Sequence, residues 1–281
     1  MTETDVVERR MAETLPDMPR YRALSRVFSS RLMLAALIVA MVNAVFSVVT
    51  TVVNYLAALP EYRKSLYEIS GLSGNVGLTE YDGFFNTIFY VIIGFALLLS
   101  IGVWLLQFLP QAMLVSRARR GKLLGRKPFT VLRTYCIVVL VLMCLNLFFS
   151  AILYASAQVN LLSVVTLGMT VVAYGAIVRL LGVQREIAMW GKASRAASYK
   201  ATAFVLSLQI IPVAASMVLQ VLQFVNPQYY RLEAYSSFST GGFVASIFSA
   251  IVLFAATALY SLTILRAGKE IAAAEEQTAE L

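Results

Sequence analysis

The side chains that most often carry out catalysis are scarce in this chain of 281 residues. It has no histidine and two cysteines, Cys136 and Cys144, and no aspartate or glutamate falls within its long apolar segments. The lack of histidine excludes Ser-His-Asp triads and Cys-His pairs, and two thiols without further ligands do not make a zinc or iron–sulfur site. The lack of acids in the apolar segments excludes a membrane protease with paired aspartates. We therefore expect no enzyme, with no catalytic residue, no bound metal and no cofactor.

Uncharged polar side chains, by contrast, recur at helical spacing within three of the apolar segments. In the first segment they fall at i, i+4, i+7 and i+11, and in the fifth at i, i+7, i+11 and i+14, so each set lies on one face of a helix. Pro212 lies within the fifth segment and predicts a kink there, which we expect to act as a hinge. The polar residues are Asn43, Ser47, Thr50 and Asn54 in the first segment, Asn146 in the third, and Gln209, Ser216, Gln220 and Gln223 in the fifth.

These polar faces allow two interpretations. Isolated amide groups are costly in lipid, so the faces must point into the protein or into water. They can form hydrogen bonds between packed helices, each worth about 0.6 kcal/mol on average. Alternatively, the first and fifth helices line a polar path for a solute, which the kink at Pro212 opens. Only the second interpretation predicts a water-sized cavity between those two helices.

Basic side chains gather between the second and third apolar segments, where residues 109–133 contain no acid. Such a loop attracts anionic lipid at about 1 kcal/mol per basic residue near the membrane surface. It could equally dock an acidic protein, or only set the orientation of the chain in the membrane. The residues expected to contact anionic lipid are Arg117, Arg119, Arg120, Lys122, Arg126 and Lys127.

The elements that position all these residues are apolar helices. The chain is 59% hydrophobic and 14% charged, whereas a soluble domain averages about 45–50% and about 25%. A bilayer core of about 30 Å requires about 20 helical residues, and no segment alternates with the period of two that a membrane barrel needs. We expect an all-α, polytopic integral membrane protein, a bundle of six transmembrane helices. The predicted spans are 32–59, 84–108, 132–155, 161–182, 201–225 and 243–265.

The basic residues also predict how the bundle is oriented. With six spans, all but Arg63, Lys64 and Arg231 of the 23 lysines and arginines lie on the same side as both termini. Cytoplasmic loops accumulate Lys and Arg, so we expect three hairpins with both termini cytoplasmic, in the cell (plasma) membrane. The expected divisions are an N-terminal segment, 1–30, with a helix on the membrane surface, a transmembrane domain, 31–267, and a short tail, 268–281.

Two classes of function remain. The first is a non-enzymatic subunit or scaffold that assembles with other membrane proteins or with copies of itself. The second is a small transporter, channel or permease component for a neutral or anionic solute. The absence of charged side chains within the spans favours the first class. The expected partners are the lipid bilayer and anionic lipid at its cytoplasmic face, and no feature indicates nucleic acid.

Overall fold

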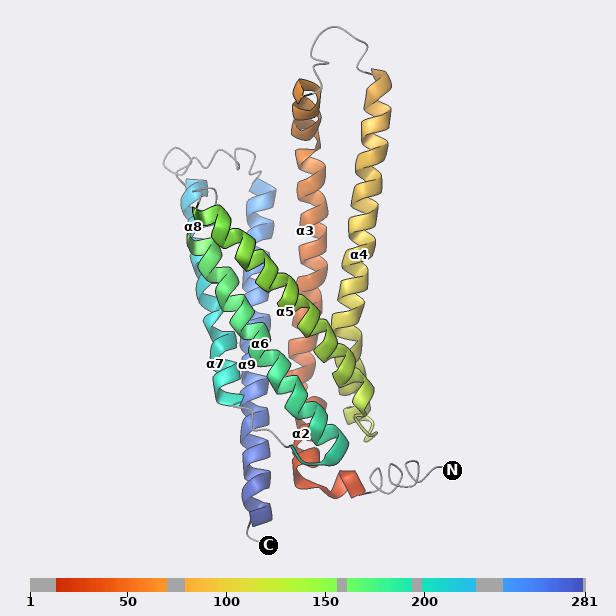
Figure 1. Ribbon diagram of the computed structural model, residues 1–281, viewed down its shortest axis with the longest axis vertical. Coiled ribbons are helices and arrows are strands. Elements are labelled where there is room, and N and C mark those ends of the chain that lie inside the picture. Colours follow the sequence, from red (N-terminus) through yellow and green to blue (C-terminus); the bar gives the residue numbers. More distant parts are fainter. Residues whose placement is uncertain (1–13, 70–78, 156–160, 194–198, 226–239, 280–281) are drawn as a thin grey trace.

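The computed structural model describes residues 14–69, 79–155, 161–193, 199–225 and 240–279 (Figure 1). Within these ranges the chain is helical and has no strand. The apolar segments are too long for strands and carry helical periodicity, which accounts for the all-α fold. The elements are the 3₁₀ helix η1 (Leu15–Asp17) and the α-helices α2 (Pro19–Ser29), α3 (Arg31–Ile69), α4 (Thr79–Arg119), α5 (Arg126–Ala155), α6 (Leu161–Trp190), α7 (Tyr199–Leu208), α8 (Ile210–Val225) and α9 (Thr240–Ala279).

Five of the described helices are long and apolar enough to cross a membrane, which is compatible with an integral membrane protein. Their outer surfaces are apolar as well: Val91, Phe95 and Leu98 on α4 are each more than 60% exposed. Apolar surface of this extent requires a cover of lipid or of protein. The apolar stretches are Arg31–Thr50, Asn86–Arg119, Arg126–Leu153, Val164–Trp190 and Ile247–Ala274.

The predicted span 201–225 is divided into α7 and α8 at Gln209. Pro212 explains the position of the break, because a proline ring clashes with the carbonyl four residues earlier, that of Leu208, and supplies no N–H to it. The Gln209 N–H instead donates to the Leu206 carbonyl at 3.1 Å, as in a 3₁₀ turn. This region therefore gives a shorter apolar helix, Tyr199–Ala215, instead of a sixth continuous span among the described residues.

The helices pack as a bundle in which α9 is central. α3 packs against α4 and α9, α5 against α4 and α6, and α7 and α8 against α9. The densest core lies at the end of the bundle where α2 crosses it, in the lower part of Figure 1. Its most completely buried large side chains are Leu24, Leu114, Leu124, Phe129 and Ile187.

The amphipathic helix predicted before the first span is present as α2, and its apolar face lies against protein. Tyr21, Leu24, Val27 and Phe28 are all buried, and α2 packs against α4, α6 and α9. The Leu124 N–H, in the turn after α4, donates to Tyr21 Oη at 2.9 Å. An apolar face flanked by basic residues is typical of a helix on the membrane surface. In this structure the apolar face of α2 is instead buried against other helices of the bundle.

The end of α6 lies against the start of this N-terminal segment. Gly191 follows α6 with a φ of +65°, and a Cβ atom there would overlap the side chain of Met18. Glycine is favoured on both counts, because other residues rarely adopt this φ and because the Met18 side chain would have to move to admit a Cβ atom. The backbone of this turn therefore fixes η1 and α2 closely against α6.

Candidate functional site

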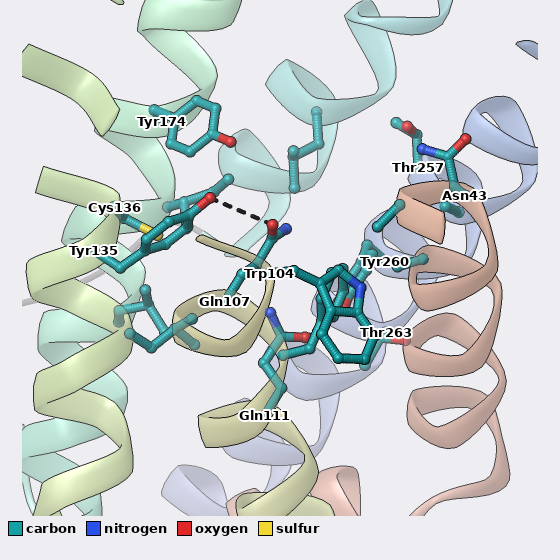
Figure 2. A pocket seen from close by; sticks show the side chains of 18 of the residues that line it. Asn43, Trp104, Gln107, Gln111, Tyr135, Cys136, Tyr174, Thr257, Tyr260 and Thr263 are labelled. Atoms are coloured by element: carbon teal, nitrogen blue, oxygen red, sulfur yellow. Dashed lines mark hydrogen bonds between the residues drawn. The ribbon is translucent and has the colours of Figure 1, made fainter. Parts of the chain in front are cut away.

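An interior cavity of about 630 Å³ opens between α3, α4, α5, α6 and α9 (Figure 2). Val27 and Phe28 of α2 line it, so α2 lies across one end. Cavities that hold small ligands are typically about 300–1,000 Å³ and mostly apolar, with a few polar groups in fixed positions. This cavity has those properties, and its polar groups show what it can bind.

Helix α4 presents a stripe of four residues to the cavity: Ser100, Trp104, Gln107 and Gln111. They fall at i, i+4, i+7 and i+11 and therefore share one face of the helix. Gln107 and Gln111 are half-buried and buried respectively, although the helix around them is apolar. The stripe makes α4 the main polar wall.

Two hydrogen bonds join this wall to neighbouring helices. Tyr135 on α5 donates to Gln107 Oε1 at 3.3 Å, the dashed line in Figure 2. Tyr260 on α9 donates to Gln111 Oε1. Each phenol is amphipathic, with a ring that packs against apolar neighbours and a hydroxyl that reaches an amide. The two glutamines thus fix α4 between α5 and α9 at the level of the cavity.

Two polar atoms of the lining have no partner among the described residues. The Trp104 indole N–H is an unpaired donor, and Asn43 Oδ1 on α3 is an unpaired acceptor; both atoms are buried. The hydroxyls of Ser100 and Thr257, in contrast, donate to carbonyls of their own helices at 2.8 and 2.9 Å. An unsatisfied buried polar group costs about 1–3 kcal/mol. Trp104 and Asn43 are therefore the positions where a bound molecule would gain most from hydrogen bonding.

Among the described residues that line the cavity, none carries a charged side chain. Cys136, a buried thiol on α5, is part of the lining, and the described residues hold no cluster of histidine, cysteine or acidic side chains that could bind a metal. Without an acid, a base or a charge, the described lining is suited to binding an uncharged molecule, because a buried ion without a partner would lose its hydration uncompensated.

The structure brings two of the predicted polar residues of the first segment to this cavity. Asn43 and Ser47 both line it. Thr50 does not, and its hydroxyl donates to the Phe46 carbonyl at 2.8 Å. The side chain of Asn54 lies outside the described residues. The other described polar groups of the cavity come from α4, α5, α6 and α9, while α7 contributes Leu206.

Of the remaining predicted residues, Asn146, Gln209 and Pro212 are described and do not line the cavity. Asn146 is exposed on α5 and accepts a hydrogen bond from Ser150 at 3.4 Å. Gln209 and Pro212 lie at the break between α7 and α8. The side chains of Ser216, Gln220 and Gln223 lie outside the described residues, so their place relative to a path is a prediction still.

The sequence analysis missed Gln107 and Gln111. It ended the second span at residue 108, whereas α4 continues through Pro110 to Arg119. Gln107 falls within the predicted span, and only Gln111 falls beyond its end. With the helix extended to Gln111, the α4 stripe repeats the i, i+4, i+7, i+11 pattern of the first segment, and this spacing is the signal that indicates both glutamines.

The predicted basic residues divide into two groups. Arg117, Arg120 and Lys122 line a separate recess at the end of α4. The other three, Arg119, Arg126 and Lys127, are exposed and do not line it.

Comparison with protein-family models, with curated proteins and with solved structures found no match to this chain.

Proposed function

We propose that this protein is a multi-pass membrane protein that binds an uncharged, amphipathic small molecule in its interior cavity, as a small transporter or permease component. The observation that carries the proposal is a ligand-sized cavity with no charged lining and two unpaired polar atoms, Trp104 Nε1 and Asn43 Oδ1. The lack of a cationic side chain in the lining argues against an anionic solute.

The matching ligand has an apolar body and a hydrogen-bonding group. Its polar group accepts a hydrogen bond from the Trp104 indole and donates one to Asn43. Its apolar body packs against the rings of Tyr135, Tyr174 and Phe108, which also line the cavity. Such a molecule partitions into the bilayer by itself, which suits a cavity among membrane helices.

The proposed arrangement in the membrane has six spans in three hairpins, with both termini in the cytoplasm of the cell. The division of lysines and arginines between the two sides supports it. The described helices account for five spans, and α7 with α8 would form the sixth, crossing with a kink at Gln209. Transmembrane helices tolerate such kinks where neighbouring helices satisfy the freed backbone groups.

A second candidate function, a subunit or scaffold of a membrane protein complex, is favoured by the outer surfaces of α4 and α5. Leu98 on α4 and Phe148 on α5 are 69% and 61% exposed. Lipid or another membrane protein, including a second copy of this chain, could cover these surfaces. A scaffold of this kind needs no ligand in the interior cavity.

The two tryptophans of the chain make a direct test of the cavity. Trp190→Phe removes the exposed indole outside the cavity and leaves Trp104 as the single tryptophan, whose emission can be excited selectively over that of the tyrosines. This variant, in lipid nanodiscs, is titrated with a medium-chain alcohol, a monoacylglycerol and a short-chain quinone. The matched medium-chain carboxylate and amine serve as charged controls. We expect at least one uncharged compound to change the Trp104 emission with saturation, and the charged compounds to leave it unchanged.

A further substitution tests the polar contact. Asn43→Leu should weaken the binding about fivefold, which corresponds to one hydrogen bond of about 1 kcal/mol. Flux of the bound compound into proteoliposomes then separates a transporter from a scaffold. A Trp104 emission that no compound alters, or that charged and uncharged compounds alter alike, would refute the binding proposal.

A further inference from the structure

A second recess, of about 560 Å³, lies where α4 ends and the chain turns toward α5, apart from the interior cavity. Three basic side chains, Arg117, Arg120 and Lys122, form part of its lining, together with Ser116. No acid occurs in residues 109–133, and no carboxylate of the described residues pairs with these three cations. The recess is therefore suited to an anionic group.

Phosphate is the anion that these side chains recognise best. Guanidinium N–H groups match phosphate oxygens in pairs, and a lysine ammonium adds a point charge. Arg117 uses one N–H for the Leu124 carbonyl, at 3.2 Å, and its remaining donors are left for a ligand. The three cations around the recess can neutralise a single phosphate group, and the Ser116 hydroxyl can donate a further hydrogen bond to it.

The turn that carries these side chains is preformed. Gly121 has a φ of +65°, and the Lys122 N–H donates to the Arg117 carbonyl at 2.9 Å, the Schellman arrangement that ends many helices. The hydrogen bond from Leu124 to Tyr21 then fastens the turn to α2. Arg117 and Lys122 are thus held at fixed positions, so little ordering is needed on binding.

A second part of the recess lining is apolar and exposed. Leu109, Met113 and Leu123 line it and are 55%, 37% and 39% exposed. Leu109 and Met113 belong to the apolar stretch Asn86–Arg119, so this wall continues the surface that meets lipid. A soluble phosphate compound would leave the apolar wall unused, whereas a phospholipid covers both sides.

We propose that this recess binds the phosphate group of one anionic phospholipid. The phosphate oxygens lie on Arg120, Lys122 and the remaining donors of Arg117, and the first acyl segments lie along Leu109 and Met113. The site is specific within the loop, unlike the diffuse attraction that all its basic residues share. It does not depend on the occupant of the interior cavity, so either proposal can fail alone.

A pair of charge-matched variants tests the proposal on the full-length protein. Arg120→Gln with Lys122→Gln removes two cations from the recess and leaves the Arg117–Leu124 hydrogen bond in place. Arg126→Gln with Lys127→Gln removes two exposed cations from the same loop outside it. Binding of short-chain phosphatidylglycerol is measured by native mass spectrometry in neutral detergent, with phosphatidylcholine as the reference lipid.

We expect the recess variant to bind phosphatidylglycerol about 25-fold more weakly, because each contacting basic residue contributes about fivefold. The control variant should stay within about threefold of the unmodified protein, and thermal midpoints should show that both variants are folded. Equal losses in the two variants would indicate diffuse attraction and overturn the site, as would an unchanged recess variant. Displacement of the lipid by millimolar inorganic phosphate would overturn the assignment to a lipid and indicate a soluble anion instead.

Discussion

Replacing Tyr21 with phenylalanine should release the N-terminal helix from the turn after α4. The substitution keeps the ring and removes the hydroxyl that accepts the hydrogen bond from the Leu124 N–H at 2.9 Å. Both residues are buried, at 4% and 0% exposure. Water therefore cannot replace the lost partner, and the backbone N–H stays unpaired.

The expected loss follows from that geometry. A buried donor without a partner costs about 1–3 kcal/mol. A loss of about 2 kcal/mol should lower the thermal midpoint by about 4–8 °C in a chain of this size, at roughly 2–4 °C per kcal/mol. Tyr90→Phe is the matched control, because Tyr90 is 57% exposed on α4 and the loss of its hydroxyl should change the midpoint little.

A thiol-reactive dye can follow the unfolding through the chain's own cysteine. Cys136 is buried and Cys144 is exposed, so Cys144→Ala leaves one thiol that reacts when the bundle opens. The two phenylalanine variants are compared in this background during a temperature ramp. Equal midpoints for Tyr21→Phe and Tyr90→Phe would refute the reasoning, because the buried hydrogen bond would then contribute nothing.

The pH dependence of stability gives a second check on the contact between Tyr21 and Leu124. Burial raises the pKa of Tyr21 above its ordinary value of 10.0, and the hydrogen bond from Leu124 lowers it by less. The folded state therefore favours the neutral phenol, and this contribution to stability is complete below pH 10.0 and is lost as the pH rises above it. The difference in midpoint between the unmodified protein and Tyr21→Phe should narrow above pH 10.0.

Four further substitutions have expected outcomes. Gly191→Ala should lower the thermal midpoint, since its φ of +65° and the close approach of the Met18 side chain disfavour a Cβ atom. Gly102→Ala, with open space around it, should instead raise stability by about 0.5–1 kcal/mol, and midpoints that move together would contradict this. Pro212→Ala should supply an N–H that donates to the Leu208 carbonyl, and should slow amide hydrogen exchange throughout the turn between Gln209 and Pro212. Unchanged exchange there would mean that proline does not cause the break. In a cysteine-free variant, a thiol placed at Gly121 should resist membrane-impermeant reagents in intact cells, and its labelling from outside would contradict cytoplasmic termini.

The all-helical fold and most of the candidate spans could be predicted from the sequence because hydropathy and charge are properties of each segment alone. In lipid, the backbone N–H and C=O groups of a segment must be hydrogen-bonded within that segment. A long apolar segment without charged residues therefore forms a helix. The division of the fifth predicted span could be predicted in part, because Pro212 indicates a kink. Its position at Gln209 follows from the same proline, which disrupts the turn that precedes it.

The cavity could be predicted only in part, because it depends on which helices are neighbours. Asn43 and Ser47 were expected to face an interior space, and they do line one. Their spacing identified the face but not its partner. The fifth predicted span, 201–225, was expected opposite this face, and Leu206 is the residue of that span among the described cavity lining. Gln107 lies in the last turn of its predicted span, 84–108, and Gln111 lies beyond the predicted end, although α4 continues to Arg119.

The position of α2 has a consequence for how the molecule is made. α2 is synthesised before any span, yet its apolar face packs against α9, the last helix. At about 5–20 residues per second, the ribosome needs roughly 10–40 s to produce the roughly 210 residues, 30–239, between them. During that interval α4 and α6 become available to α2, but the part of the apolar face that packs against α9 has no protein partner. The packing of the first α-helix is therefore completed only when the last helix has been made.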